Sequence, residues 1–347
     1  MKYLKIKNRL IGHKFEPLII AELGINHKGS LDLAIDLVDK AINAGAEMIK
    51  HQTHVLEDEM IDEAKKIRPG NSKLTIYEII KKNSLNEKNE KKLMKYVESK
   101  KCIFISTPFS KKAVDRLVSF KVPAFKIGSG ECNNYPLIKY ISKFKKPIIL
   151  STGMNSVSSI KPAVKIIESK KIPYALLHCT NIYPTPANLV RLNCMLELKK
   201  KFPRAVIGLS DHTTSNHASY AALAFGASII ERHFTDTKKR SGPDISASMD
   251  SKELKELIDG SKIIFNSLKF KGKKAPIKEE LPTIKFAFAS VVSTKTINKG
   301  EILNKNNIWV KRPGTGEFLA RDYNKILGKK ATKDIKKDIF IKRSHFK

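Results

Sequence analysis

Three charged residues end short apolar runs in this chain, at positions where a strand gains no stability from a charge. Glu22 follows the run PLIIA, Lys50 follows AEMI, and Lys126 follows AF. Removing a charge from water costs several kcal/mol unless the charge is paired, so each side chain needs a partner or a ligand. The two lysines, with nearby Ser and Thr hydroxyls, could bind a small dianion through charge-assisted hydrogen bonds. The alternative is that they form structural ion pairs with Glu22 or Glu131.

Two histidines stand at equivalent ends of consecutive apolar runs. His212 follows VIGLSD and His233 follows SIIER. If these runs are neighbouring strands, whose axes lie about 4.8 Å apart, both imidazoles could reach one divalent ion at about 2.1 Å. A lone histidine is more often structural, and that remains the alternative for each. Four further histidines are weaker candidates for the same role: His27, His51, His54 and His178.

The elements that must position these residues alternate between short apolar runs and amphipathic segments. Segments such as LDLAIDLVDKAINAG carry apolar residues at three- and four-residue spacing with polar residues opposite, which predicts helices. The apolar runs are continuous in Ile, Val and Leu, as expected of parallel strands buried on both faces. Eight strands are predicted, in segments that begin at Pro17, Ala46, Cys102, Ala124, Pro147, Tyr174, Val206 and Ser228.

Eight strand–helix units close most simply as an α/β protein of the (β/α)8 TIM-barrel type. An open doubly wound sheet is the alternative, but no G-x-G-x-x-G follows the first strand. In a barrel, the reacting groups gather at the C-terminal ends of the strands. The predicted rim consists of Glu22, Asn26, His27, Lys50, Gln52, Thr107, Lys126, Ser129, Glu131, Ser151, Asn181, Tyr183, Ser210, His212 and His233.

The length of 347 residues suits a barrel of about 250 residues with a small appendage. We expect the barrel domain to span residues 1–270, a linker containing Lys, Gly and Pro to span residues 271–285, and a second domain to span residues 286–347. The connection from about Val55 to Asn86 is too long for a minimal loop, which favours a functional role for it.

Charge and composition limit the possible function classes. Lys and Arg number 66 against 34 Asp and Glu, and this net charge of +32 could indicate nucleic-acid binding. The lysines are spread over all predicted helices and no nucleic-acid motif is present, so we expect an anionic substrate and no nucleic-acid partner. A non-catalytic polyanion-binding protein is the alternative class. No apolar run approaches the roughly 20 residues of a membrane span, and the first residues do not resemble a signal peptide. We therefore expect no membrane association and a cytoplasmic location.

Short motifs follow one another along the predicted barrel: AELGINHKGS, MIKHQTH, FISTPFS, KIGSGECNNYPLIK, PIILSTGMNS, YALLHCTNIYPTP, IGLSDHT, ERHFTD and GPDI. Two more, FAFASVV and WVKRPG, lie in the C-terminal part. In this order the motifs resemble those of the bacterial N-acetylneuraminate (sialic acid) synthase family, and the last two resemble its C-terminal SAF, or antifreeze-like, domain. The resemblance covers nearly the whole chain, and no residue expected to be catalytic departs from it.

The resemblance implies a reaction and roles for the rim residues. Phosphoenolpyruvate, N-acetylmannosamine and water would give N-acetylneuraminate and phosphate, with a divalent metal ion (Mn²⁺, or Mg²⁺ or Co²⁺) held by His212 and His233. Glu22 would orient or deprotonate groups near the metal. The residues implied for phosphoenolpyruvate are Lys50, Thr107, Lys126, Ser129, Ser151, Asn181 and Ser210. Those implied for the sugar are Gln52, Asn71, Glu131, Tyr183, Asp244 and Arg312.

The resemblance also implies a domain-swapped homodimer, in which the SAF domain of one subunit closes the active site of the other through Arg312. Legionaminic and pseudaminic acid synthases of the same family share the phosphate and metal residues and differ mainly in their sugar contacts. Both activities therefore remain alternatives to N-acetylneuraminate synthesis.

Overall fold

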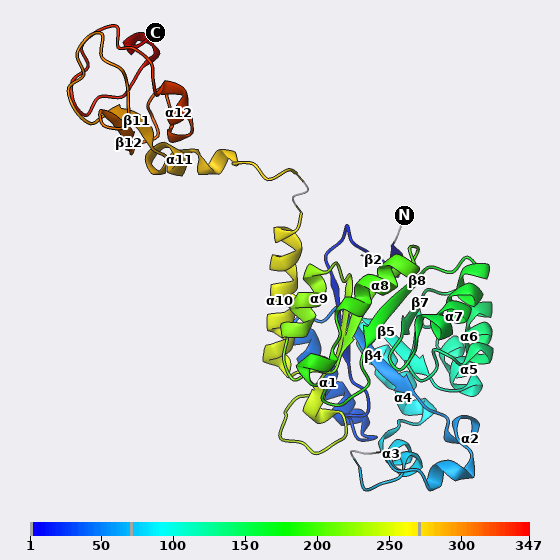
Figure 1. Cartoon of the computed structure of the whole chain (residues 1–347). Helices are drawn as coiled ribbons and strands as arrows, with labels where there is room; N and C mark the ends of the chain where they lie inside the picture. The colour runs from blue at the N-terminus through cyan, green and yellow to red at the C-terminus, as the bar shows by residue number, and fades with distance from the viewer. Residues whose placement is uncertain (1–2, 70–71, 270–271) are drawn as a thin grey trace. The chain divides into compact units, whose positions relative to one another are not determined.

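The computed structural model describes residues 3–69, 72–269 and 272–347. The chain divides into two compact units, residues 1–270 and residues 271–347. The colour gradient in Figure 1 follows the chain through both units. Each unit has its own buried apolar cluster.

The first unit is a closed barrel of eight parallel strands, as the sequence predicts. Each strand lies within one of the predicted segments. The strands are β3 (Leu18–Glu22), β4 (Met48–Thr53), β5 (Ile103–Pro108), β6 (Phe125–Ile127), β7 (Ile148–Ser151), β8 (Tyr174–Cys179), β9 (Val206–Asp211) and β10 (Ile229–His233). They neighbour one another in chain order, and β10 pairs with β3 to close the barrel.

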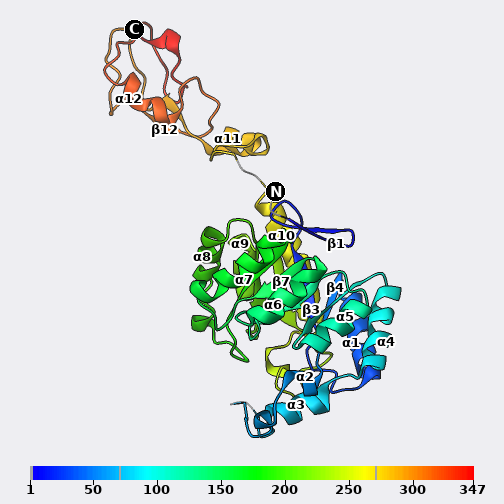
Figure 2. The same ribbon diagram turned by 90° about the vertical axis from the view of Figure 1, so that its right-hand side faces the viewer.

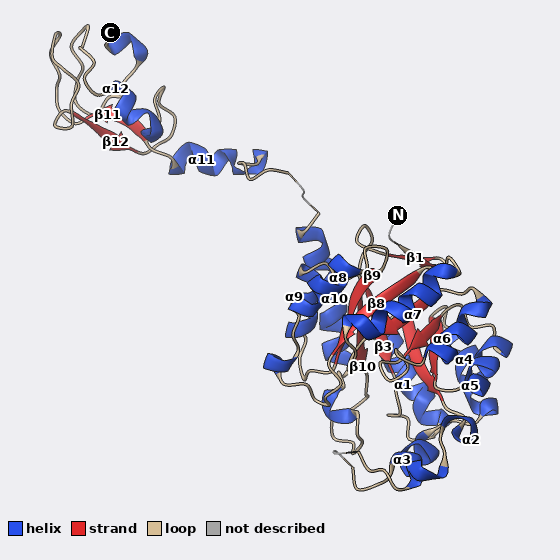
Figure 3. Cartoon of the chain, turned by 45° about the vertical axis from the view of Figure 1, so that its right-hand side comes forward, coloured by secondary structure: helices blue, strands red, loops and turns tan. Residues whose placement is uncertain are grey.

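Helices follow the strands and cover the outside of the barrel (Figure 3). They are α1 (Leu31–Asn43), α4 (Glu87–Ser99), α5 (Lys111–Ser119), α6 (Tyr135–Ile141), α7 (Val157–Ser169), α8 (Asn193–Lys201), α9 (His217–Ala224) and α10 (Ser251–Ser267). In Figure 2, α6 and α7 lie side by side on the outer surface. Local signals fix several helix starts. The Asp250 side chain accepts a hydrogen bond from the Glu253 amide, and the Glu253 side chain accepts one from the Asp250 amide, which forms a capping box at α10.

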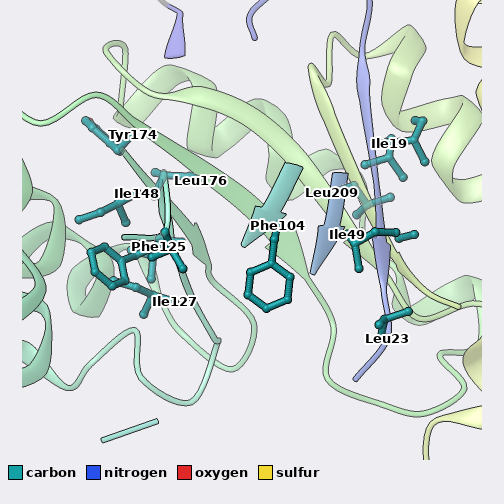
Figure 4. Close-up of a cluster of buried hydrophobic side chains, with 14 of the residues drawn as sticks. Ile19, Leu23, Ile49, Phe104, Phe125, Ile127, Ile148, Tyr174, Leu176 and Leu209 are labelled. Atoms are coloured by element: carbon teal, nitrogen blue, oxygen red, sulfur yellow. The ribbon is translucent and has the colours of Figure 1, made fainter. Parts of the chain in front are cut away.

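The outer core layer lies between the strands and the helices. Figure 4 shows Ile19, Ile49, Phe104 and Leu209 in this layer. Because successive residues of a strand face opposite sides, the residue after Ile49 faces the barrel interior. That residue is Lys50. The apolar layer thus fixes which face of each strand carries the functional side chains.

An antiparallel hairpin of β1 (Leu4–Ile6) and β2 (Arg9–Ile11) precedes the barrel. Leu4, Ile6 and Ile11 are fully buried in one cluster with interior residues such as Met48 and Ile149. Figure 1 shows the hairpin at the barrel end opposite α2 (Leu56–Glu59) and α3 (Ile76–Asn83). This hairpin was not predicted from the sequence, and it supplies apolar side chains to the barrel interior.

The long connection after β4 folds into short helices. It contains α2, the 3₁₀ turn Asp62–Lys65 and α3. Helix α3 begins with a capping box between Thr75 and Glu78. The connection is therefore an ordered part of the barrel's C-terminal end over its described residues.

The second unit is built around a small antiparallel pair, β11 (Ser290–Ser293) and β12 (Ile308–Lys311), with the short helix α12 (Tyr323–Ile326). Val291, Ile308 and Ile335 are among its buried residues. Part of the segment expected to be a linker is helical, because the 3₁₀ turn Lys278–Glu280 leads into α11 (Leu281–Ala287).

Candidate active site

A buried cluster of charges occupies the C-terminal end of the barrel interior. Strand register places Glu22 opposite Lys50 on one side and opposite His233 on the other. The Lys50 Nζ lies 2.9 Å from Glu22 Oε2 and donates to Thr107 Oγ1 at 3.2 Å. Glu22 and Lys50 are both almost fully buried. The ion pair named as the alternative for Lys50 is therefore present, but it lies within the predicted rim and does not exclude a ligand there.

Lys126 completes this cluster from β6. Its Nζ donates to Ser151 Oγ at 2.7 Å and to the carbonyl oxygen of Ile127 at 3.1 Å. Its carboxylate neighbour is Glu231, whose Oε1 lies 3.6 Å from the Nζ atoms of both Lys126 and Lys50. Glu231 thus holds two buried ammonium groups near one another.

Glu231 was missed at the sequence level, although a signal was present. It stands two residues before His233 in the strand segment IIERH. Residues two apart on a strand share a face, so Glu231 belongs on the same face as the predicted rim residue. Ser210, its register partner on β9, donates to Glu231 Oε1 at 3.4 Å.

Opposite charges in the cluster counteract the effect of burial on the pKa of each group. Burial disfavours the charged form of Lys50, but the carboxylates of Glu22 and Glu231 outweigh this effect and raise the pKa of Lys50. Burial lowers the pKa of Lys126, with Lys50 adding to the effect and Glu231 opposing it. Burial acts to raise the pKa of Glu231, yet Lys126 and Lys50 outweigh it and lower that pKa. An incoming dianion would meet two ammonium groups already gathered in a low-dielectric interior.

Two of the side chains predicted to bind the same ligand, Ser129 and Asn181, lie beside Gly153. The Gly153 amide donates to Ser129 Oγ at 3.0 Å. A Cβ atom added to Gly153 would lie 1.9 Å from Asn181 Oδ1 and 2.9 Å from Ser129 Oγ. Only glycine therefore lets these side chains approach the backbone at this point.

The two predicted metal ligands are neighbours. The ring centroids of His212 and His233 lie 5.5 Å apart, and the Tyr183 ring lies 4.1 Å from that of His212. The Nδ1 atom of His212 lies 3.0 Å from the carbonyl oxygen of Thr180. A carbonyl only accepts hydrogen bonds, so Nδ1 carries the proton and Nε2 keeps a lone pair for a ligand.

This arrangement fits a metal bound through two imidazoles. Two imidazoles on one ion, each at about 2.1 Å, place their rings roughly 5 Å apart, close to the observed separation. Over the described ranges, no group of three His, Cys, Asp or Glu side chains is assembled for a metal ion. An ion held here would take its remaining ligands from water or substrate, as open catalytic sites do.

Four of the residues predicted to bind the sugar lie at the same mouth: Gln52, Glu131, Tyr183 and Asp244. Gln52 Nε2 donates to Glu22 Oε1 at 2.9 Å, and Asp244 Oδ2 lies 3.5 Å from His233 Nδ1. Burial, with the nearby Glu59, raises the pKa of Glu131 to about 7. Glu131 Oε2 is a buried oxygen without a hydrogen-bond partner among the described residues.

Asn71 and Arg312 are the other two residues predicted to contact the sugar. Asn71 falls outside the described residues. Arg312 belongs to the second unit, directly after β12, and its side chain is exposed.

Gly24 shows how closely the backbone approaches this part of the site. Its φ of +52° lies in the left-handed region. An added Cβ would lie 2.9 Å from both His233 Nδ1 and Asp244 Oδ2. A side chain at this position would displace His233 or Asp244.

Comparisons with known proteins agree with this architecture. Residues 37–273 match the NeuB family and residues 288–347 match the SAF domain. The chain is 40% identical over 333 residues to N,N'-diacetyllegionaminic acid synthase of Campylobacter jejuni, covering 94% of this chain and 98% of that protein. It is 32% identical over 338 residues to human N-acetylneuraminate-9-phosphate synthase, covering 95% of this chain and 92% of that protein.

A solved structure is also similar to this chain. It is the N-acetylneuraminic acid (sialic acid) synthetase of Leptospira borgpetersenii in complex with citrate, with a TM-score of 0.74 and 32% identity. The likeness covers 81% of this chain and 95% of that chain. The chain belongs to the NeuB family of sialic acid synthases and carries a C-terminal SAF domain. None of its described helices is both long and apolar enough to cross a membrane.

Proposed function

We propose that this chain condenses phosphoenolpyruvate with N-acetylmannosamine and water to form N-acetylneuraminate and phosphate. The observation that carries the proposal is the pair of buried lysines, Lys50 and Lys126, near the His212–His233 pair at one barrel mouth. The two lysines suit a small dianion, and the two histidines suit a metal ion that activates an aldehyde. The similarity to a sialic acid synthetase supports the same reaction.

The lysines would hold phosphoenolpyruvate through its phosphate and carboxylate. Five hydroxyl and amide side chains would add hydrogen bonds to the same oxygens: Ser129, Ser151, Thr107, Asn181 and Ser210. Glu231, which balances both lysines in the structure, keeps the ammonium groups in place before the dianion arrives. The chain thereby sets the position of C3, the carbon that must form the new bond.

The acceptor would bind beside the histidines in its open-chain form. His212 and His233 would hold a divalent ion, with Mn²⁺ as our first choice, and the ion would supply Lewis-acid stabilisation of the growing charge on the aldehyde oxygen. Five side chains would orient the sugar: Gln52, Asn71, Glu131, Tyr183 and Asp244. Glu22 would accept hydrogen bonds from groups that approach the aldehyde end.

The reaction balances without any further reactant. The C3 carbon of phosphoenolpyruvate forms a bond to the aldehyde carbon, whose oxygen takes up a proton. Water adds at C2 and gives a tetrahedral intermediate. That intermediate loses phosphate by cleavage of the C2–O bond and leaves the 2-keto acid. Positioning of the two reacting carbons is the main contribution of the protein, and effective molarities of oriented groups reach about 10⁵ M or more.

We also propose that the active form is a homodimer in which Arg312 of one subunit contacts the N-acetyl sugar in the barrel of the other. The planar donors of the Arg312 guanidinium suit an amide or hydroxyl oxygen.

A second acceptor class is favoured by a specific observation. The Campylobacter relative with 40% identity is a diacetyllegionaminic acid synthase. Initial rates with N-acetylmannosamine and with the diacetamido hexoses, each titrated at saturating phosphoenolpyruvate, would separate the two acceptors. A higher kcat/KM for a diacetamido hexose would reassign the acceptor and leave the phosphoenolpyruvate chemistry in place.

The different-class alternative, polyanion binding, has its own test. The net charge of +32 motivates it, and a salt titration of nucleic-acid binding measures it. The enzyme proposal would be replaced if nucleic-acid binding is site-specific with a steep salt slope and if phosphoenolpyruvate releases no phosphate with any acceptor.

A further inference from the structure

A chain of hydrogen bonds leads from the long connection after β4 to the carboxylate of Glu22. The Nδ1 atom of His54 lies 2.9 and 3.1 Å from the two carboxylate oxygens of Glu59, which ends α2. The Nε2 atom of His54 lies 3.2 Å from Gln52 Oε1. Gln52 Nε2 in turn donates to Glu22 Oε1 at 2.9 Å.

The direction of each bond follows from what its partners can do. An ionised carboxylate only accepts, so Glu22 must face the amide nitrogen of Gln52. The amide oxygen of Gln52 then faces His54 and requires an N–H from it. The Glu59 carboxyl group contacts the other ring nitrogen, Nδ1, and fixes the orientation of the ring. Nε2 is therefore the ring nitrogen that donates to Gln52.

The surroundings leave the His54 ring little freedom. Its side chain is only 3% exposed, and its ring is stacked on Phe109 with centroids 4.4 Å apart and an interplanar angle of 8°. The Arg116 guanidinium approaches the His54 carbonyl oxygen at 3.5 Å. The other charged or titratable groups near it are His27 from the connection after β3 and, beside Glu59, Glu131 from the connection after β6.

We propose that His54, held by Glu59, is a positioning residue that acts on the active site through Gln52. Its Nε2–H fixes which end of the Gln52 amide faces Glu22. Without that donor the amide can turn and present its oxygen to the Glu22 carboxylate, where two acceptors repel. The inference rests on the proposed function, because it assigns Gln52 and Glu22 to the acceptor half of the site.

Two amide substitutions separate this role from a general structural one. The amide nitrogen of glutamine at position 54 lies near the place of the ring Nε2, whereas that of asparagine lies near the place of Nδ1. His54→Gln therefore keeps a donor for Gln52, and His54→Asn keeps one only for Glu59. Both variants lose the ring and its stacking on Phe109. They differ by one methylene group and in which neighbour of position 54 keeps a donor.

We expect His54→Asn to lower kcat/KM for the acceptor by about 10- to 100-fold, in the range seen when supporting hydrogen-bond partners of a catalytic site are removed. His54→Gln should stay within about threefold of the wild type. The KM for phosphoenolpyruvate should change by less than about twofold in both variants, because the lysine cluster keeps its partners. Equal losses in the two variants would overturn the proposal. His54→Phe, which keeps an aromatic ring against Phe109, should behave as His54→Asn does and replaces it if that variant does not fold.

A double-mutant cycle tests whether the effect passes through Gln52. In a Gln52→Ala background, the difference between Asn and Gln at position 54 should disappear, because the coupled group is gone. If the difference persists, His54 acts by another route and the proposal is wrong.

A measurement that needs no turnover distinguishes failure of this inference from failure of the proposed function. In protein labelled with ¹⁵N-histidine, the His54 signals, assigned by their loss in His54→Gln, should show a proton on Nε2. An Nε2 without a proton in the wild type would contradict the inference even if the enzyme is active, and a protonated Nε2 would support it even if the acceptor is reassigned.

Discussion

Lys126 Nζ and Glu231 Oε1 lie 3.6 Å apart although their strands, β6 and β10, stand on opposite sides of the closed barrel. The contact therefore crosses the barrel interior. Lys50, from β4, reaches the same carboxylate oxygen at the same distance. A dianion bound between these lysines would be held from several directions at once.

Lys126→Met should raise the KM for phosphoenolpyruvate by about 10- to 100-fold and change the KM for the acceptor much less. A hydrogen bond to a charged group contributes about 1.5–3 kcal/mol, and methionine keeps most of the apolar stem. Steady-state titration of each substrate measures both values. The control is Lys139→Met, which removes an exposed lysine from α6. An unchanged phosphoenolpyruvate KM would restrict Lys126 to a structural ion pair.

His212→Ala and His233→Ala should each abolish metal-dependent turnover and weaken metal binding, with the barrel still folded. Both side chains belong to the polar mouth and lie outside the apolar layers. Metal titration by calorimetry and circular dichroism of the same samples give the two readouts. Wild-type activity in either variant, after chelation and metal replacement, would show that the assigned ligands are wrong.

The raised pKa of Glu131 predicts that the free energy of unfolding depends on pH. Its pKa is raised to about 7 in the folded protein, from 4.5 for an unperturbed glutamate, chiefly by burial. Between these values the folded state holds a proton that the unfolded state has lost, so stability falls as pH rises through this interval. The loss amounts to roughly 3 kcal/mol at about 1.4 kcal/mol per pKa unit.

Glu131→Gln removes this titration, so its stability relative to the wild type should increase between pH 4 and pH 8. Denaturant unfolding at several pH values measures the difference. Parallel stability curves for the two proteins would mean that the Glu131 carboxyl is not desolvated as described.

Mixing two inactive variants tests the shared active site. A mixed dimer of His233→Ala and Arg312→Ala contains one site with both defects and one with neither. Some activity should therefore return after subunit exchange, up to about a quarter of the wild-type rate for random exchange of equal amounts if sites act independently. Exchange is followed with differently tagged subunits. No recovery among demonstrated mixed dimers would rule out the proposed contribution of Arg312 across subunits.

The barrel could be predicted because each strand is a continuous apolar run, which the buried parallel strands require. Glu22, Lys50 and Lys126 stand out in such runs, and the structure brings all three near Glu231 or one another. The β1–β2 hairpin could not be predicted in the same way. Its strands, LKI and RLI, are three residues long, which is too short for periodicity to identify them.

The sequence also could not show which charged side chains pair across the barrel. The sequence suggested Glu22 or Glu131 as partners of the lysines, whereas the partner of Lys126 is Glu231. A charge that faces the interior can pair with any strand around the barrel, and this choice depends on closure and register. The position of His54 was visible in the sequence, but its contact with Glu59 depends on the fold of α2.

The most direct test of the account is the fate of the bridging oxygen of phosphoenolpyruvate. The chain is incubated with N-acetylmannosamine, a divalent metal and phosphoenolpyruvate labelled with ¹⁸O between C2 and phosphorus, and both products are analysed by mass spectrometry. We expect N-acetylneuraminate without the label and phosphate that carries it, because C–O cleavage releases that oxygen with the phosphate. Label retained in the sugar acid, or no condensation product from N-acetylmannosamine, would contradict the proposed reaction.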